Sequence, residues 1–196
     1  WLDAGLPSGR PAASAPRGLS RSPASEIRIA PAKIHRISSN EDSYQCFVLE
    51  PELDLDVFVD SLDFRSSNPS TIHHIMAFLD VSGETRSLPK TWDCMRDGVV
   101  NHWLPIDSWS KGQRLIRYSR PYAYRFPRGS RLVLQTHYGN EGNKGKLERT
   151  TVSLHLAPEP PGREVRWAIV NKLDLAIPAN TTRVETLAYP VDKDTA

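Results

Sequence analysis

Short apolar runs rich in β-branched and aromatic residues recur from Glu26 onwards, separated by clusters of Pro, Gly, Asn and Ser. Runs of this kind are typical of antiparallel strands. No segment keeps a helical period for three turns, and the 16 prolines would interrupt most helices. We therefore expect an all-β domain. Strands are predicted over residues 27–37, 44–49, 57–64, 72–79, 122–126, 132–138, 151–156, 165–170 and 183–188.

An antiparallel β-sandwich accommodates these strands, because it buries one face of each sheet. A chain of 196 residues is long enough for one such domain. Between residues 82 and 121 the strand pattern breaks down, so we expect a long connection there. Connections of this length are usually functional or covalently tied down. This one contains Trp92, Cys94, His102, Trp103 and Trp109.

Residues 1–25 lack both hydrophobic periods and are rich in Pro, Ala, Ser and Arg, which is typical of a linker. We expect an extended N-terminal linker over residues 1–25 and the sandwich over residues 26–196. No apolar run approaches the roughly 20 residues that span a bilayer, and the chain starts at Trp1 without a signal region. The sequence predicts a soluble segment, processed or excised from a longer chain, without a transmembrane segment.

Charge is balanced along the chain. The 25 basic and 23 acidic residues are interspersed and give a formal net charge of +2. A protein that binds nucleic acid usually concentrates basic residues into a stripe that neutralises phosphates. Nucleic acid is therefore not an expected partner.

The only two cysteines are Cys46 and Cys94. They lie too far apart for a Cys-x-x-Cys motif, and the chain has no Cys-x-x-Cys-His haem attachment site. We favour one long-range disulfide, which would indicate an oxidising compartment such as the periplasm or the cell exterior. Two unrelated buried thiols are the alternative.

Three histidines are the best candidates for chemistry. His73 and His74 open the apolar run 72–79, and His137 lies in the similar run 132–138. Neighbours on a regular strand point to opposite faces, so His73 and His74 reach one ion only under special conditions. The strand must be bulged or strongly twisted, or a ring nitrogen near the backbone must be used. Three neutral imidazoles would then suit copper or zinc.

A structural role competes with metal binding, because a strand histidine is more often a hydrogen-bonded core or surface residue. Spacing alone does not decide between the two. His35, His102 and His155 have no paired context, and we treat each as structural. Met76 has apolar neighbours and is expected in the core rather than as a thioether ligand.

Several separated motifs add a family resemblance. They are YQC at 44–46, VDSLDF at 59–64, HHIM at 73–76, WDC at 92–94, FPRG at 126–129, LQTHYG at 134–139, VSLHL at 152–156 and AIPA at 176–179. In order and approximate spacing they resemble the N-terminal domain of the copper type II, ascorbate-dependent monooxygenases, the family of peptidylglycine α-hydroxylating and dopamine β-monooxygenases. The resemblance covers about residues 40–190.

This resemblance implies a jelly-roll-like β-sandwich that binds one copper ion through His73, His74 and His137. It also implies a disulfide between Cys46 and Cys94.

The resemblance further places Gln135 and Tyr44 near the metal, where hydrogen bonds from them would orient the ligands. In this family the copper of the N-terminal domain stores and relays electrons. Oxygen activation belongs to a second copper in the following domain, held by a His-x-His pair and a methionine. The chain contains no His-x-His. We therefore expect that it is not a complete hydroxylase by itself.

The segment Trp1–Gly9 resembles the closing segment of a cytochrome c domain that precedes such copper domains in some bacterial proteins. Residues 1–25 would then be the tail of a cytochrome c-like domain. This implies a redox partner or neighbouring domain that carries haem or the second copper.

Three hypotheses follow. The first is a copper-binding electron-relay domain of a monooxygenase-like protein. The second is a structural or docking module in a larger redox assembly, which predicts an exposed apolar patch unless its aromatic residues pack against the sandwich. That patch would comprise Trp92, Trp103, Trp109, Tyr122 and Tyr124. The third, a zinc-dependent hydrolase, ranks last because no general base lies near the histidines in sequence.

Overall fold

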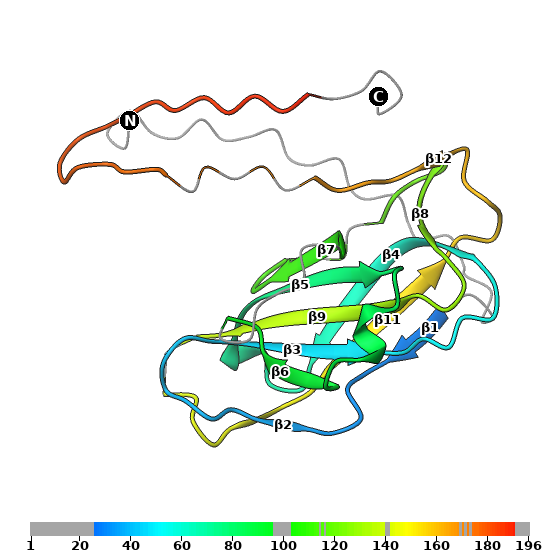
Figure 1. Ribbon diagram of the computed structural model, residues 1–196, viewed down its shortest axis with the longest axis horizontal. Coiled ribbons are helices and arrows are strands. Elements are labelled where there is room, and N and C mark those ends of the chain that lie inside the picture. The colour runs from blue at the N-terminus through cyan, green and yellow to red at the C-terminus, as the bar shows by residue number, and fades with distance from the viewer. Residues whose placement is uncertain are drawn as a thin grey trace.

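The computed structural model describes residues 26–95, 103–113, 115, 117–139, 142–168, 170, 172 and 174–190. These residues form two five-stranded sheets packed face to face, which confirms the predicted all-β sandwich (Figure 1). The linker predicted over residues 1–25 lies outside the described residues. None of the described residues forms a helix that is long and apolar enough to cross a membrane.

The sheet that carries the histidines has the strand order β6-β3-β9-β5-β7, and all of its pairs are antiparallel. Its strands are β6 (Thr91–Asp93), β3 (Ser43–Leu49), β9 (Arg131–Tyr138), β5 (Ile72–Asp80) and β7 (Leu104–Ser110). A short 3-10 helix (Pro69–Thr71) leads into β5, and a second one (Glu84–Arg86) follows it.

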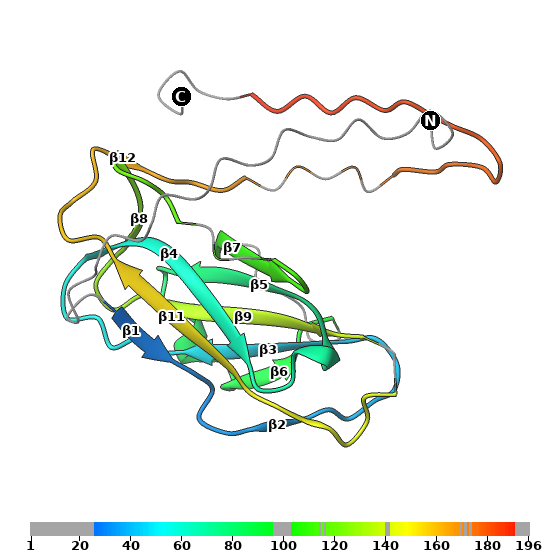
Figure 2. The ribbon, with the colours of Figure 1, turned by 180° about the vertical axis from the view of Figure 1, so that it is seen from behind.

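The opposing sheet has the strand order β1-β11-β4-β8-β12 and is the nearer of the two sheets in the view of Figure 2. Its strands are β1 (Glu26–Ile29), β11 (Thr150–Leu156), β4 (Val57–Ser66), β8 (Tyr122–Phe126) and β12 (Arg163–Glu164). Only the β12–β8 pair is parallel among the described strands. A separate pair joins β2 (His35–Arg36) to β10 (Leu147–Glu148).

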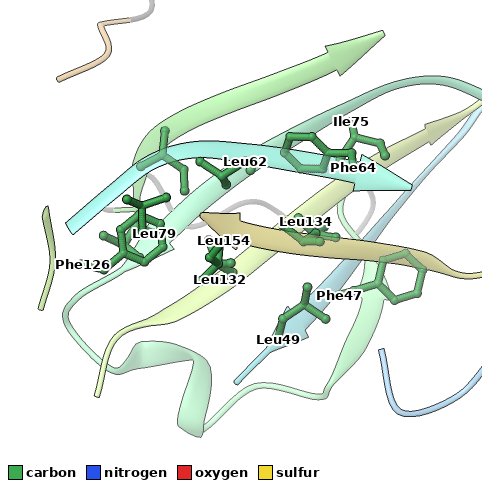
Figure 3. Close-up of a cluster of buried hydrophobic side chains, with 14 of the residues drawn as sticks. Phe47, Leu49, Leu62, Phe64, Ile75, Leu79, Phe126, Leu132, Leu134 and Leu154 are labelled. Atoms are coloured by element: carbon green, nitrogen blue, oxygen red, sulfur yellow. The ribbon is translucent and has the colours of Figure 1, made fainter. Parts of the chain in front are cut away.

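The hydrophobic core lies between the two sheets (Figure 3). It is built by alternation: Leu132, Leu134 and Tyr138 of β9 are fully buried in it, whereas Gln135 and His137 face the other side of the same sheet. Burial of each such aliphatic side chain contributes about 1.5–3 kcal/mol. Other core side chains are Phe47, Leu49, Leu62, Phe64, Ile75, Leu79, Phe126 and Leu154.

A second, smaller cluster covers the outer face of the histidine-bearing sheet. Cys46 and Cys94 form a disulfide, so the favoured interpretation of the two cysteines is confirmed. Trp103 is 5% exposed and packs with this disulfide and with Val133. The rings of Trp92 and Trp103 meet edge to face at 5.9 Å.

The docking hypothesis predicted an exposed aromatic patch, and this prediction is wrong. Trp103 and Tyr124 are buried, and Trp92 and Trp109 are half-buried. Only Tyr122 is exposed, at 41%. These aromatic residues pack against the sandwich, which is the alternative stated with that hypothesis.

The connection predicted between residues 82 and 121 is also wrong in part, because it contains β6 and β7. Strand β7 lies at the sheet edge and pairs with β5. Its Pro105 stands opposite Phe78, next to a register shift between Ala77 and Phe78. Proline is tolerated at edge strands and bulges because no ladder hydrogen bond is lost there. The proline and the irregular register explain why the apolar pattern of the sequence did not predict β7.

Two predicted strands do not form. Near the segment 165–170, the strand assigned is the preceding Arg163–Glu164, which pairs with β8, and Val165 adds one backbone hydrogen bond to Ala123. Residues 183–188 are extended without a strand partner among the described residues. After β12, Val165 and Trp167 still pack against the core. Further along the chain, the described residues from 174 to 190 form an arm that runs out and back (Figure 1). A β pattern indicates extended backbone, and a strand also needs a neighbour.

Candidate metal centre

The three histidines meet on the outer face of the histidine-bearing sheet, where β5 and β9 are hydrogen-bonded neighbours. His74 stands directly opposite His137, and Ile72 stands opposite Tyr138. Ile72 and His74 are two positions apart in β5, whereas their partners Tyr138 and His137 are adjacent in β9. His73 is therefore the extra residue of a β-bulge. This bulge is the condition under which two consecutive histidines can share one ion.

The ring nitrogens nearest the backbone converge. His73 Nδ1 lies 3.0 Å from His74 Nδ1, and His137 Nδ1 lies 3.3 Å from His74 Nδ1. All three ligand atoms lie within 4.8 Å of one another. Two nitrogens bound about 2.0 Å from one ion at a tetrahedral angle are about 3.3 Å apart. The two distances to His74 Nδ1 are thus close to the spacing that a single metal ion requires.

The site is graded from buried to exposed. The His137 ring is buried, the His74 ring is half-buried and the His73 ring is exposed. Burial lowers the pKa of His74, and charge repulsion from His137 and His73 lowers it further. A lowered pKa favours neutral imidazole, which is the form that binds metal ions.

Tyr44 of β3 packs its ring flat on His137, with a centroid distance of 4.2 Å and an interplanar angle of 7°. The strands place these two residues directly opposite each other. The role of Tyr44 in orienting a ligand through a hydrogen bond stays a prediction, and its contact with His137 is ring stacking. This stacking contact fixes the plane of the His137 ring.

Gln135 lies two residues before His137 on the same face of β9, opposite Cys46 of β3 and Met76 of β5. Its role in orienting a ligand stays a prediction. Met76 is half-buried on this outer face and belongs to neither buried cluster, so its expected place in the core is wrong. Met76 and His74 share one strand face, which explains the difference.

The other histidines lie elsewhere or outside the described residues. His35 stacks on Tyr138 with ring centroids 5.3 Å apart, and burial lowers the pKa of His35. His155 lies on β11 of the opposing sheet. Both are separate from the trio, as predicted. His102 lies outside the described residues.

One contact at the site was missed by pattern reasoning. Asp42 Oδ1 lies 3.2 Å from His137 Nε2, on the side of the ring away from the other histidines. Asp42 precedes Tyr44 by two residues. Once β3 is known to pair with β9, that spacing indicates that Asp42 and Tyr44 approach the same histidine.

Neither a protein-family model nor a curated protein sequence matches this chain. Its fold and site define an all-β sandwich with a three-histidine group that can hold a metal ion. Three protein nitrogens leave at least one coordination position for another ligand.

Proposed function

We propose that this chain is a copper-binding electron-relay domain of a monooxygenase-like redox protein, with one copper ion on His73, His74 and His137. The observation that carries this proposal is the convergence of three Nδ1 atoms at the β5 bulge. The motif resemblance supports copper rather than zinc. When bound, the copper would alternate between Cu(I) and Cu(II).

The residues of the chain would hold that ion with little rearrangement. Neutral imidazoles support both oxidation states without adding net charge. The His137 ring is buried and covered by Tyr44, so its position is fixed, whereas the exposed His73 gives the site an edge at the surface. Such an edge suits electron exchange with a redox partner or a neighbouring domain. The disulfide supports a periplasmic or extracellular location.

Copper titration followed by electron paramagnetic resonance tests the metal site. We expect one Cu(II) per chain with nitrogen hyperfine structure, and loss of this signal in His137→Ala. His155→Ala is the matched control, because His155 lies on the opposing sheet. A wild-type protein that takes up no stoichiometric copper would contradict the proposal.

The relay function needs a separate measurement. Stopped-flow mixing of the Cu(II) protein with ascorbate, and then of the Cu(I) protein with oxidised cytochrome c, should show one electron entering and leaving per copper. A protein that binds zinc in preference and shows no reversible copper couple would favour the hydrolase alternative instead.

A structural or docking module is the second candidate, and the arm is the observation that favours it. Within the described part of the arm, apolar side chains are exposed: Leu175, Ile177, Val184, Leu187 and Tyr189. Val184 is 89% exposed. Sedimentation velocity with and without a purified cytochrome c, on wild type and on a Val184→Ser/Tyr189→Ser variant, tests this role. A monomer that binds no cytochrome c, with or without the substitutions, argues against it.

A further inference from the structure

The contact between Asp42 and His137 bears on which nitrogen of His137 is free to bind a metal. A neutral imidazole carries one N–H donor and one acceptor nitrogen. An ionised carboxylate only accepts hydrogen bonds. With Asp42 Oδ1 at 3.2 Å from His137 Nε2, the proton of the neutral ring belongs on Nε2. The lone pair is then on Nδ1, which faces His74 Nδ1 at 3.3 Å.

We propose that Asp42 is a positioning residue that holds His137 in the Nε2–H tautomer and so selects Nδ1 as its metal-binding atom. This inference rests on the metal-binding function proposed above. Metal-ligating histidines commonly donate their second N–H to a carboxylate, and loss of such a partner typically weakens metal binding 10–100-fold.

One contact and the burial of the ring make the tautomer of His137 decisive for metal binding. Tyr44 stacks on the ring at 4.2 Å and holds its plane. The ring is also buried, at 8% exposed, which leaves little room for it to turn over. If the proton moved to Nδ1, an N–H would point at His74 and block the ion. A fixed ring therefore needs its proton placed correctly.

The charge of Asp42 is not the main contribution. Its side chain is 53% exposed, so solvent screens its electrostatic attraction for a cation. The hydrogen bond instead fixes which ring nitrogen of His137 carries the proton, and solvent screening does not remove this effect. A nearby carboxylate without this contact should then have no comparable effect. Glu41, exposed and adjacent in sequence, provides that comparison.

The first experiment measures the tautomer without metal. Nitrogen-15 NMR of the metal-free protein, with His137 assigned through the His137→Gln variant, reports which ring nitrogen is protonated. We expect the Nε2–H form in wild type and in Glu41→Ala, and a mixture of both tautomers in Asp42→Ala. Wild-type protein with the proton on Nδ1 would overturn the inference.

The second experiment measures copper affinity and the electron paramagnetic resonance spectrum. We expect Asp42→Ala to bind Cu(II) 10–100-fold more weakly with an altered nitrogen hyperfine pattern, Asp42→Glu to recover most of the affinity, and Glu41→Ala to match wild type. Circular dichroism melting establishes that each variant is folded, which the exposure of Asp42 favours.

The outcomes separate the two proposals. If wild type binds no copper, the proposed function fails, and the NMR result alone decides the role of Asp42. If wild type binds copper and Asp42→Ala binds it equally well with the same spectrum, the inference about Asp42 is overturned while the metal site stands.

Discussion

The role of a single residue in this protein depends on which face of its strand it occupies. In β9, His137 belongs to the outer site and its neighbour Tyr138 to the core, although only one peptide bond separates them. Tyr138 is fixed there by donating its hydroxyl to the buried carboxylate of Glu148. A polar group placed between the sheets is tolerated because it has partners. The buried carboxylate of Asp80 follows the same rule, because it accepts hydrogen bonds from Ser82, Gly83 and Thr85.

Asp107 of β7 is a buried carboxyl with few hydrogen-bond partners. It is 7% exposed and accepts a hydrogen bond from the backbone N–H of Ser108. Burial raises the pKa of Asp107 from 3.8 to about 6, against the lowering effect of that hydrogen bond. The folded protein therefore binds this proton more tightly than the unfolded chain does, and stability is lost as the pH rises between these values.

We predict that Asp107→Asn stabilises the protein above pH 6, by at most about 3 kcal/mol, because each pKa unit corresponds to about 1.4 kcal/mol. Urea unfolding at pH 4 and pH 8 measures this. The gain should be present at pH 8 and nearly absent at pH 4. Asp174→Asn, at a largely exposed position, is the control and should change little. An equal effect of Asp107→Asn at both pH values would contradict the prediction.

At the scale of elements, the bulge in β5 brings two consecutive residues to the same side of the strand. In a regular strand only one of His73 and His74 would face His137. We predict that His73→Ala and His74→Ala each weaken copper binding by at least tenfold, because each removes one of three nitrogens. Isothermal titration measures the affinities, with Met76→Leu on the same strand as the control. If either histidine variant binds as wild type does, His73 and His74 do not act together.

The elements also show what the sequence could and could not predict. Local patterns predicted most strands and the residues of the trio, because apolar runs and paired histidines are local features. The bulge at His73 depends on how β5 aligns with β9, which is a property of two distant segments. Asp42 was missed for the same reason, since its contact needs the β3–β9 pairing. The failed strand at 183–188 lacked only a neighbour.

At the scale of the molecule, the Cys46–Cys94 disulfide ties β3, an inner strand of the histidine-bearing sheet, to the segment that follows the edge strand β6. The two cysteines are 48 residues apart in sequence. A loop of that size corresponds to about 4 kcal/mol of lost chain entropy in the unfolded state, within a usual range of 2–4 kcal/mol. The backbone N–H of Cys94 also donates to the carbonyl of Tyr44, the residue that stacks on His137.

We predict that the Cys46→Ser/Cys94→Ser variant loses about 2–4 kcal/mol of unfolding free energy, and that it binds copper more weakly because Tyr44 is less firmly held. Urea unfolding and copper titration measure the two effects, with wild type in a reductant as a second sample. An unchanged denaturation midpoint would show that the bridge does not stabilise the fold.

The alternation along β9 has a consequence for how the sheet finds its alignment. A slip of one residue against β5 would turn His137 inward and bring Leu134 to the surface. An ion that binds only when His74 and His137 stand opposite each other lowers the free energy of that alignment and of no other. A metal ion bound during folding would therefore stabilise the correct register of β5 and β9 relative to slipped registers.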